Sequence, residues 1–563
     1  MRQRTYKNSQ KKKKSNTSLV KVVAMDNYSR NIFYNRFSLR SKRPILAALT
    51  GATLILLIFA IVEFAIGYDA NQLIPPDPEN PQPPSWSKLR IFKRGAVCAD
   101  GPPCAFIGKS ILERNGSAVD ATLAAMICNG FINMHSLGFG GGFLMTIYER
   151  NTEKAYFLDA RYSAPGAAHE RMYDYKPENA SKTGGLSVAV PGELAGYWEA
   201  HTKFGKLPWK DLVQPSIEVC ENGYNLTKSQ YKGLQEDNFN IYDDPTLKAK
   251  WREPTKTRLS DGIRIYSAGV PGGGDILAFI MNVLDEFKFT NESTADINST
   301  VITFQRVIET FKYAYAFRTK LGDSDFVDTS QLLNNLTSRE FSRLYWSKIS
   351  SERTWKDPSY YGAEDPGNFN NHGTSHISVL APNGDAVSIT STVNLYFGSG
   401  IVSERTGILL NSGMDDFGLP SRFSYFRIPP SKNNFIKPGK RPLSSMSPTI
   451  LVDPNGDVKM IIGAAGGTKI ITAITFVIMK YLWMENNLKE AVDFSRIHHQ
   501  LYPMKVIYEY GVQKQIIDGL KKLGHETLRY KTHGSVICAI AQHNKSIFAN
   551  SDYRKNGDVY GLD

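Results

Sequence analysis

The stretch "NHGTSHISVL" (residues 371–380) lies in the middle of the chain and places the pair Gly373-Thr374 at the start of an alternating apolar and polar run. Such alternation predicts a strand with one buried face. A Gly-Thr pair before a strand is ordinarily a turn. The alternative is a peptide bond that the protein cleaves in itself, so that Thr374 becomes a new amino terminus and a nucleophile.

The chemistry of threonine gives a reason for self-cleavage at this bond. A threonine hydroxyl is a poor nucleophile unless a base stands beside it. An amino-terminal threonine supplies its own base, because an α-amino group titrates at about pH 8 and is partly neutral at physiological pH. Glycine at position 373 gives the backbone the freedom that an N-to-O acyl shift needs. The strand that follows would hold the nucleophile on a rigid element.

The carboxy-terminal third of the chain carries strong strand and hairpin signals. Two pairs of alternating runs are joined by Asn383-Gly384 and Asn455-Gly456, the dipeptide typical of tight β-hairpins. "SVICAIA" (residues 535–541) is a further predicted strand, and the apolar run at residues 468–484 has the length of a core helix. These elements predict sheets covered by helices.

The region before them begins with a helix signal. In "GSAVDATLAAMICNGF" (residues 116–131), Ser117 and Asp120 have the spacing of a capping box, and apolar residues recur at helical intervals. A glycine-rich loop at residues 138–142 follows and leads into a strand. Phosphate-binding loops need the order strand, loop, helix, so we interpret this loop as close backbone packing.

The charge is concentrated at the amino terminus. Of the net +13, residues 1–43 carry +12, so the remainder carries +1, and we expect no nucleic-acid partner. Residues 44–62 are apolar and uncharged, about the length of a membrane-spanning helix. A core helix and a cleaved signal peptide are the alternatives, but the long basic tail does not fit a signal peptide. The positive-inside rule predicts a single-pass type II protein of the plasma membrane.

This topology predicts five segments. They are a basic cytoplasmic tail (1–43), a transmembrane signal anchor (44–67), a Pro-rich stalk (68–88), and two parts of an extracellular domain (89–373 and 374–563). All five cysteines lie on the outer side, where disulfides persist. The outer side also carries N-glycosylation sequons, which predict a glycoprotein: Asn115, Asn179, Asn225, Asn291, Asn298, Asn335 and Asn544.

Several common catalytic and nucleotide-binding motifs are absent from the sequence. It has no HExxH, no paired CxxC, no P-loop and no GxSxG. Metal-assisted hydrolysis and nucleotide chemistry are therefore unsupported, and we expect no metal and no organic cofactor.

Several longer motifs carry a family resemblance. They read "NGSAVDATLAAMICNGFINMHSLGFGGG", "GGLSVAVPGELAGYWEAH", "GTSHISVLAPNGDAVSITSTVNLYFGS", "GILLNSGMDDF", "PLSSMSPTI" and "GAAGGTKIITA". From about residue 96 to the end, the chain resembles the γ-glutamyltransferases, or glutathione hydrolases. The resemblance implies a type II anchored proenzyme that cleaves itself into a heterodimer. It also implies an α+β, four-layer αββα sandwich of the amino-terminal nucleophile hydrolase type.

The resemblance assigns a role to each site residue. Thr374 matches the cleavage site and nucleophile, and Thr392 the hydroxyl that supports it. The other matches are Arg161, Ser444 and Ser445 for the substrate's α-carboxylate, Asn394 and Asp416 for its α-ammonium, Gly466 and Gly467 for the oxyanion hole, and Cys104–Cys128 as a disulfide. A planar guanidinium suits a bidentate grip on a carboxylate, and backbone amides suit a developing oxyanion.

The sequence also departs from the family pattern. Gly413 stands where relatives commonly have an acidic or amide side chain, and Tyr162 where an acid is usual. "NHG" replaces the common "DGG" before Thr374, and several dozen residues are missing between about residues 234 and 264. These departures predict weaker substrate affinity and slower self-cleavage.

The sequence thus predicts an ectoenzyme that cleaves the γ-glutamyl amide of glutathione and its conjugates. The γ-glutamyl group would pass through an ester on Thr374 to water, or to an acceptor amino acid or dipeptide. Two alternatives stay open. One is a catalytically silent membrane glycoprotein of the same fold that serves as a binding module. The other is an amidase for a different acyl group, such as a β-lactam side chain.

Overall fold

The computed structural model describes residues 75–224, 249–363, 373–420, 431–530 and 534–563. The basic tail, the anchor, the first residues of the stalk and the sequon at Asn225 lie outside these ranges. In the described ranges no helix has the length and apolarity needed to span a membrane. The chain divides into two units, residues 1–76 and 77–563, and the description below concerns the second.

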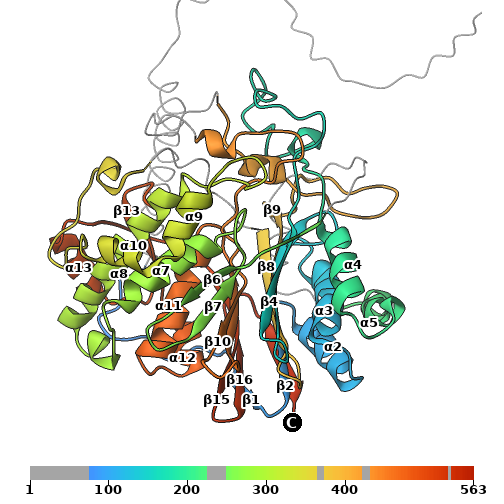
Figure 1. Cartoon of the computed structure of the whole chain (residues 1–563), viewed down its shortest axis with the longest axis horizontal. Coiled ribbons are helices and arrows are strands. Elements are labelled where there is room, and N and C mark those ends of the chain that lie inside the picture. The colour runs from blue at the N-terminus through green and yellow to red at the C-terminus, as the bar shows by residue number, and fades with distance from the viewer. Residues whose placement is uncertain (1–74, 225–248, 364–372, 421–430, 531–533) are drawn as a thin grey trace, which may run out of the picture. The chain divides into compact units, whose positions relative to one another are not determined.

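Two seven-stranded antiparallel sheets form the middle of this unit (Figure 1). Sheet I has the order β17 (Asp558–Leu562), β2 (Gly95–Ala99), β8 (Gly373–Leu380), β9 (Ala386–Asn394), β3 (Gly142–Glu149), β4 (Lys154–Ala160), β5 (Lys250–Arg252). Sheet II has the order β1 (Arg90–Phe92), β16 (Ser546–Ser551), β15 (Val536–His543), β11 (Val458–Ala465), β10 (Thr449–Val452), β7 (Arg264–Ser267), β6 (Thr255–Arg258). A small third sheet holds β12 (Ile497–His498), β13 (Lys505–Tyr508) and β14 (Glu526–Arg529).

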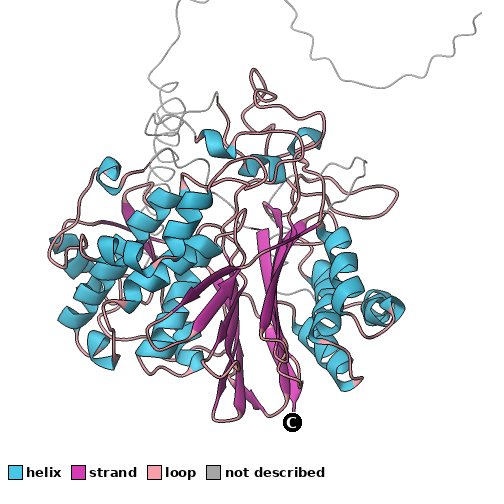
Figure 2. Cartoon of the chain, in the orientation of Figure 1, coloured by secondary structure: helices cyan, strands magenta, loops and turns pink. Residues whose placement is uncertain are grey.

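Helices cover the outer faces of both sheets (Figure 2). Beside sheet I lie α2 (Pro102–Glu113), α3 (Ala118–Ile132), α4 (Glu193–Phe204) and α5 (Trp209–Asn222). On the side of sheet II lie α7 (Gly274–Asp285), α8 (Ile297–Arg318), α9 (Ser330–Thr337), α10 (Arg339–Trp346), α11 (Lys469–Trp483), α12 (Leu488–Asp493) and α13 (Lys514–Lys522). Short 3-10 turns are η1 (Gly185–Ser187), η2 (Asn291–Thr294), η3 (Pro358–Tyr361), η4 (Gly413–Asp416) and η5 (Lys432–Asn434).

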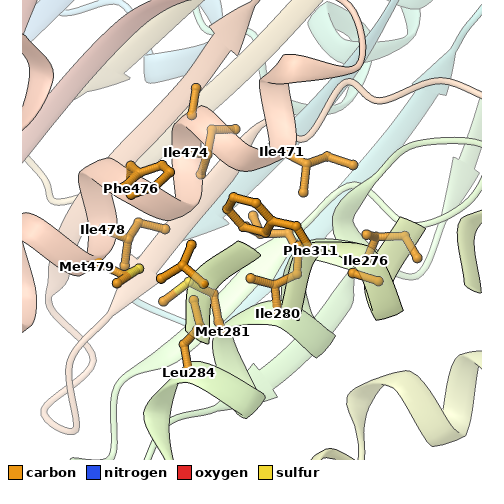
Figure 3. Packing of buried hydrophobic residues seen from close by; sticks show 14 of the residues in the cluster. Ile276, Ile280, Met281, Leu284, Phe311, Ile471, Ile474, Phe476, Ile478 and Met479 are labelled. Atoms are coloured by element: carbon orange, nitrogen blue, oxygen red, sulfur yellow. The ribbon is translucent and has the colours of Figure 1, made fainter. Parts of the chain in front are cut away.

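Three hydrophobic cores hold these layers together. One lies between sheet II and its helices, where Phe311 of α8 packs among α7 and α11 side chains such as Ile280 and Ile474 (Figure 3). A second lies between sheet I and its helices. The third joins the inner faces of the two sheets, with Ala96 and Cys538 among its members. Each fully buried aliphatic or aromatic side chain contributes about 1.5–3 kcal/mol, so the cores fix the two sheets against each other.

The sequence predictions for these elements are confirmed. Both Asn-Gly pairs form hairpin turns, β8–β9 and β10–β11, with Gly384 and Gly456 at φ +85° and +86° in the left-handed region that glycine adopts freely. The strand at residues 535–541 is β15, the apolar run is the core helix α11, and α3 begins with the Ser117–Asp120 capping box. The described unit is thus an α+β sandwich.

The glycine-rich loop before β3 packs as predicted. A Cβ on Gly140 would lie 1.9 Å from the carbonyl oxygen of Leu409, and one on Gly141 would lie 2.4 Å from that of Thr392. No other residue fits without moving the backbone. The loop therefore lies directly against the end of β9, where the site residues are.

Candidate active site

Thr374 is the second residue of β8 and lies in the hairpin with β9. Thr374 is opposite Thr392, whereas Gly373 is opposite Asn394, so the register shifts at the Gly373-Thr374 bond. The extra residue is Val393 of β9, opposite the Gly373-Thr374 bond, so the hairpin has a β-bulge there, which bends a strand locally and re-aims a side chain. The regular ladder is therefore interrupted at the bond that the sequence marked for self-cleavage.

The Thr392 hydroxyl lies at the centre of this bulge. Thr374 Oγ1 is 3.4 Å from Thr392 Oγ1, and the Thr392 hydroxyl donates a hydrogen bond to the carbonyl oxygen of Gly373. It also accepts one from the Asn394 amide at 2.8 Å. A donor on the Gly373 carbonyl can stabilise negative charge that develops there during attack by Thr374. Thr392 thus contacts both residues of the predicted cleavage bond, and its supporting role stays a prediction.

A buried cation supports Thr374 from the other side, and the sequence reasoning missed it. Lys555 Nζ donates to the Thr374 carbonyl oxygen at 2.8 Å, to Ser375 Oγ at 2.8 Å and to Asp100 Oδ2 at 3.0 Å. Asp100 Oδ2 also accepts from the His376 amide at 3.0 Å. Lys555 and Asp100 lie 455 residues apart in sequence, and neither stands in a recognisable motif, so only the folded chain reveals them.

Histidine side chains near the nucleophile are not free to act as its base. Both ring nitrogens of His376 have hydroxyl partners, Thr390 at 2.8 Å and Ser378 at 3.0 Å, and burial lowers its pKa to about 3. His135 lies within electrostatic range of Lys555 and Asp100, and burial lowers its pKa to about 3 as well. This leaves the α-amine of a cleaved Thr374 as the base adjacent to its own hydroxyl.

The predicted carboxylate-binding residue Arg161 follows β4 and is fully enclosed. Its Nη2 pairs with Asp416 Oδ2 at 2.6 Å, and the two side chains are 1% and 3% exposed. Its Nε donates to the carbonyl of Pro442 at 2.8 Å, and its Nη2 also contacts the carbonyl of Leu443 at 3.3 Å. The guanidinium is therefore held against the segment that continues into Ser444 and Ser445.

The other candidate ligands connect this buried polar cluster, which we call the pocket, to the hairpin. Asn394 Nδ2 donates to the carbonyl of Ser412 at 2.9 Å, directly before η4, which contains Asp416. Ser444 Oγ accepts from the Met446 amide at 3.2 Å, which fixes the loop that carries both serines. Contacts thus run without a break from Thr374 through Thr392, Asn394 and η4 to Arg161.

Three of the five predicted substrate-binding residues carry a buried polar atom with no hydrogen-bond partner among the described residues: Arg161 Nη1, Asn394 Oδ1 and Ser445 Oγ. Buried polar groups in native proteins are nearly always paired. Two donors and one acceptor on these three side chains therefore remain for a ligand. A carboxylate beside an ammonium matches this set of atoms.

The predicted oxyanion glycines lie at the start of α11. Gly466 and Gly467 have φ +133° and +62°, and a Cβ on Gly466 would lie 2.8 Å from the Gly534 carbonyl oxygen, so glycine is required at 466. Free amide groups at a helix N-terminus favour negative charge. The role of these glycines as an oxyanion hole stays a prediction.

Tyr162 and Gly413, the two residues that depart from the family pattern, lie in contact with each other. The Tyr162 hydroxyl donates to Asp416 Oδ2 at 2.6 Å, and a Cβ on Gly413 would lie 2.1 Å from Tyr162 Cε2. The aromatic ring thus fills the space into which a side chain at 413 would project. The sequence suggested two independent losses, whereas the structure shows one replacement.

A buried acid next to Thr392 was also missed. Ser391 Oγ lies 2.8 and 2.9 Å from the two carboxyl oxygens of Glu193, and the Tyr197 hydroxyl donates to Oε1 at 2.5 Å. Burial raises the pKa of Glu193 to about 8. The side chain is therefore protonated at neutral pH and braces β9 from its outer face.

The remaining predicted residues lie away from this site. Cys104 and Cys128 form a disulfide that joins α2 to α3. The asparagines of five sequons are exposed and that of a sixth, Asn335, is half-buried; the exposed ones are Asn115, Asn179, Asn291, Asn298 and Asn544. Whether they carry glycans stays a prediction.

Comparison with known proteins places the chain in a fold class first. The solved cephalosporin acylase from Bacillus halodurans superposes with a TM-score of 0.71 at 19% identity, covering 87% of this chain and 100% of the acylase. The shared fold is the two-sheet sandwich described above.

Sequence comparison then gives the family. The family model described as Gamma-glutamyltranspeptidase matches residues 104–249 and 243–562. Scoloptoxin SSD14 of Scolopendra dehaani is 37% identical, over 91% of this chain and 98% of the toxin. Glutathione hydrolase proenzyme 2 of Schizosaccharomyces pombe is 34% identical, over 83% of this chain and 87% of that protein. The chain belongs to the gamma-glutamyltranspeptidase family, as its motifs predicted.

Proposed function

We propose that this protein is a γ-glutamyl hydrolase and transferase that acts on glutathione and its conjugates. The observation that carries the proposal is the bulge opposite Gly373-Thr374, which sets Thr374 beside Thr392. A chain of contacts connects this hairpin to the buried polar atoms that have no hydrogen-bond partner among the described residues. Relatives named glutathione hydrolase, such as the human glutathione hydrolase 5 proenzyme at 30% identity over 84% of this chain, support the same substrate class.

Self-cleavage comes first. The Thr374 hydroxyl attacks the Gly373 carbonyl carbon, and Thr392 donates a hydrogen bond to the carbonyl oxygen. The peptide C–N bond breaks, the amine takes up the proton, and Gly373 is left as an ester on Thr374 Oγ1. Water then hydrolyses the ester and frees the hydroxyl and the α-amine. Two chains result, residues up to 373 and residues 374–563.

The two chains would remain together as a heterodimer. In sheet I, β8 of the second chain lies between β2 of the first chain and its own β9, and β17 pairs with the other edge of β2. In sheet II, β1, β7 and β6 of the first chain flank four strands of the second. Separation would break backbone ladders in both sheets and open the core between them.

Turnover then uses the freed terminus. The α-amine accepts the Thr374 hydroxyl proton as its oxygen attacks the γ-carbonyl, and the amides of Gly466 and Gly467 stabilise the oxyanion. The leaving amine takes the proton, which leaves a γ-glutamyl ester on Thr374. Water or the amino group of an acceptor amino acid or dipeptide displaces the ester, so the kinetics are ping-pong.

The pocket determines which acyl group enters. We assign the substrate's α-carboxylate to Arg161 Nη1 and Ser445 Oγ, since both are buried donors without partners among the described residues. Asn394 Oδ1 is the matching acceptor for the α-ammonium. Asp416, which the sequence assigned to the ammonium, already pairs with Arg161, so its first role is to hold the guanidinium.

We further propose that the enzyme acts outside the cell as a type II plasma-membrane glycoprotein. The uncharged run at residues 44–62 behind a strongly basic tail supports the anchor. The exposed sequons and the disulfide Cys104–Cys128 suit an oxidising compartment. Surface biotinylation of cells that express the full chain, with and without peptide N-glycosidase treatment, tests this location.

Denaturing electrophoresis and an anilide assay test the function. The purified ectodomain should give two chains divided before Thr374 and release p-nitroaniline from γ-glutamyl-p-nitroanilide, whereas Thr374→Ala should give one chain and no release. A single wild-type chain without turnover would instead support the catalytically silent glycoprotein. Turnover of a β-lactam side-chain amide with none of the γ-glutamyl anilide would support the other amidase.

A further inference from the structure

The acyl pocket contains one residue whose ring and hydroxyl both shape it. Tyr162 is fully buried. A Cβ at position 413 would lie 2.1 and 2.3 Å from Tyr162 Cε2 and Cδ2, far inside van der Waals contact. Because a packed interior does not yield by such amounts, position 413 can hold only glycine while Tyr162 is present. No side chain from η4 can therefore reach the pocket at 413.

The Tyr162 hydroxyl also changes what Asp416 can offer. Asp416 Oδ2 accepts from the hydroxyl at 2.6 Å and from Arg161 Nη2 at 2.6 Å. The guanidinium carbon of Arg161 lies 4.4 Å from the centre of the Tyr162 ring, in a cation–π contact. The same carboxylate oxygen thus carries two short hydrogen bonds, one of them charge-assisted. Oδ2 of Asp416 is therefore already occupied by two donors before a substrate ammonium arrives.

The charge balance favours an anion at this place. Arg318 is buried close enough to interact electrostatically with both Asp416 and Arg161, and burial lowers its pKa. Arg161 and Arg318 therefore both interact electrostatically with Asp416, while the nearby carboxylate of Asp159 pairs with Arg252 and Arg441. The buried acceptor without a described partner is Asn394 Oδ1, an uncharged amide. Hydrogen bonds to neutral acceptors are roughly half as strong as those to carboxylates.

We infer that Tyr162 is a specificity-determining residue that makes the pocket recognise an acyl donor by its carboxylate and only weakly by its α-ammonium. The substrate class then extends to glutaryl amides, which have the same carboxylate and acyl carbon but no α-amino group. This inference rests on the proposed function. The reaction is unchanged: Thr374 Oγ1 forms a glutaryl ester, the amine leaves with a proton, and water hydrolyses the ester.

The test compares two donors on the purified, self-cleaved ectodomain. We expect kcat/KM for glutaryl-p-nitroanilide within about tenfold of that for L-γ-glutamyl-p-nitroanilide, because the amine loses only a neutral hydrogen bond. Glutarate and L-glutamate should likewise inhibit with similar constants. A preference for the γ-glutamyl donor above about a hundredfold, the scale of a charged contact, overturns the inference and leaves the proposed function intact. If the enzyme turns over neither donor, both this inference and the proposed function are overturned.

Variants locate the effect at Tyr162. Tyr162→Phe keeps the ring over Gly413 but removes the hydroxyl. Asp416 Oδ2 then loses the hydrogen bond from that hydroxyl and can accept one from a substrate ammonium. We expect the preference for the γ-glutamyl donor to rise about threefold to tenfold. The matched control is Tyr173→Phe. Tyr173 belongs to the same buried hydrophobic cluster as Tyr162 and Met414, and its hydroxyl donates to the Leu186 carbonyl at 2.6 Å. The donor ratio of this control should equal that of the wild type, and an unchanged ratio in Tyr162→Phe contradicts the inference.

A double variant tests the steric half of the argument. Gly413→Glu alone should fail to accumulate as folded protein, because the Tyr162 ring occupies the space. Tyr162→Ala/Gly413→Glu should fold and place a carboxylate in the pocket, raising the γ-glutamyl preference about tenfold to a hundredfold over the wild type. A general loss of stability would lower kcat/KM for both donors by the same factor. The ratio of the two kcat/KM values therefore separates an effect on recognition from an effect on folding. A folded Gly413→Glu single variant would refute the coupling.

Discussion

The hairpin that carries Thr374 and the pocket around Arg161 are built in opposite ways. In the hairpin, the contacts of Thr392 with Thr374 and Asn394 span 18 and 2 residues of sequence, and one Asn-Gly turn fixes them. In the pocket, the contacts of Arg161 with Asp416 and Pro442 span 255 and 281 residues. The register at the reactive bond is thus set mainly by local geometry, with Lys555 as a distant support. The residues predicted to bind the acyl group come instead from segments that only the complete fold brings together.

This difference predicts that the two regions can be damaged separately. To present Thr374, the hairpin uses its own turn, the bulge, the ladders to β2 and β3, and the contact of Lys555 with the Thr374 carbonyl. The pocket can fail while the hairpin still cleaves itself. Four changes examine this separation, beginning with the one that should abolish both activities.

Thr374→Ala should abolish self-cleavage and reduce turnover of γ-glutamyl-p-nitroanilide by about 10⁴-fold or more, because removal of a nucleophile leaves only binding and the oxyanion hole. Thr374→Ser is the matched control, since it keeps the hydroxyl and should retain two chains and measurable turnover. Electrophoresis and anilide release read the two activities. A cleaved Thr374→Ala protein would show that another residue cuts the chain.

Arg161→Lys should separate the regions. Lysine keeps the charge but loses the planar fork that contacts Asp416, Pro442 and the substrate. We expect kcat/KM for the γ-glutamyl anilide to fall about a hundredfold, mainly through KM, while self-cleavage stays complete. Uncleaved Arg161→Lys protein with a normal melting temperature would contradict the independence of hairpin and pocket.

Lys555→Met should affect the hairpin in a smaller way. Its Nζ holds the Thr374 carbonyl, so we expect kcat to fall about tenfold with KM nearly unchanged. The single variant strands the buried Asp100 carboxylate, which destabilises the fold. Lys555→Met/Asp100→Asn removes both charges and is the control for stability. If this double variant recovers full kcat, Lys555 acts only as a counter-ion and does not position Thr374.

The sequence predicted the hairpin from physics and the pocket only by resemblance. Asn383-Gly384 and the alternating runs were enough to pair β8 with β9, because the hairpin turn sets the register. No periodicity could have paired Arg161 with Asp416, and Lys555 stands in no pattern that marks it. Tyr162 and Gly413 were visible as two oddities, but their meaning depends on a ring lying where a side chain would be, which is a fact of packing.

Glu193→Gln should give the smallest effect, and it concerns stability more than rate. Burial raises the pKa of Glu193 to about 8, whereas in the unfolded chain it is near 4.5. Between these values the folded protein keeps a proton that the unfolded chain has lost, so wild-type stability falls as pH rises from about 5 to 8.

Glutamine has no proton to lose and can still contact Ser391 and Tyr197. The melting temperature of the variant should therefore fall less than that of the wild type between pH 5 and pH 8, with the anilide rate at pH 7 within about twofold. Parallel decreases in the two proteins would mean that Glu193 is ionised in the fold, and that β9 is braced beside Thr392 by a charge and not by a neutral acid.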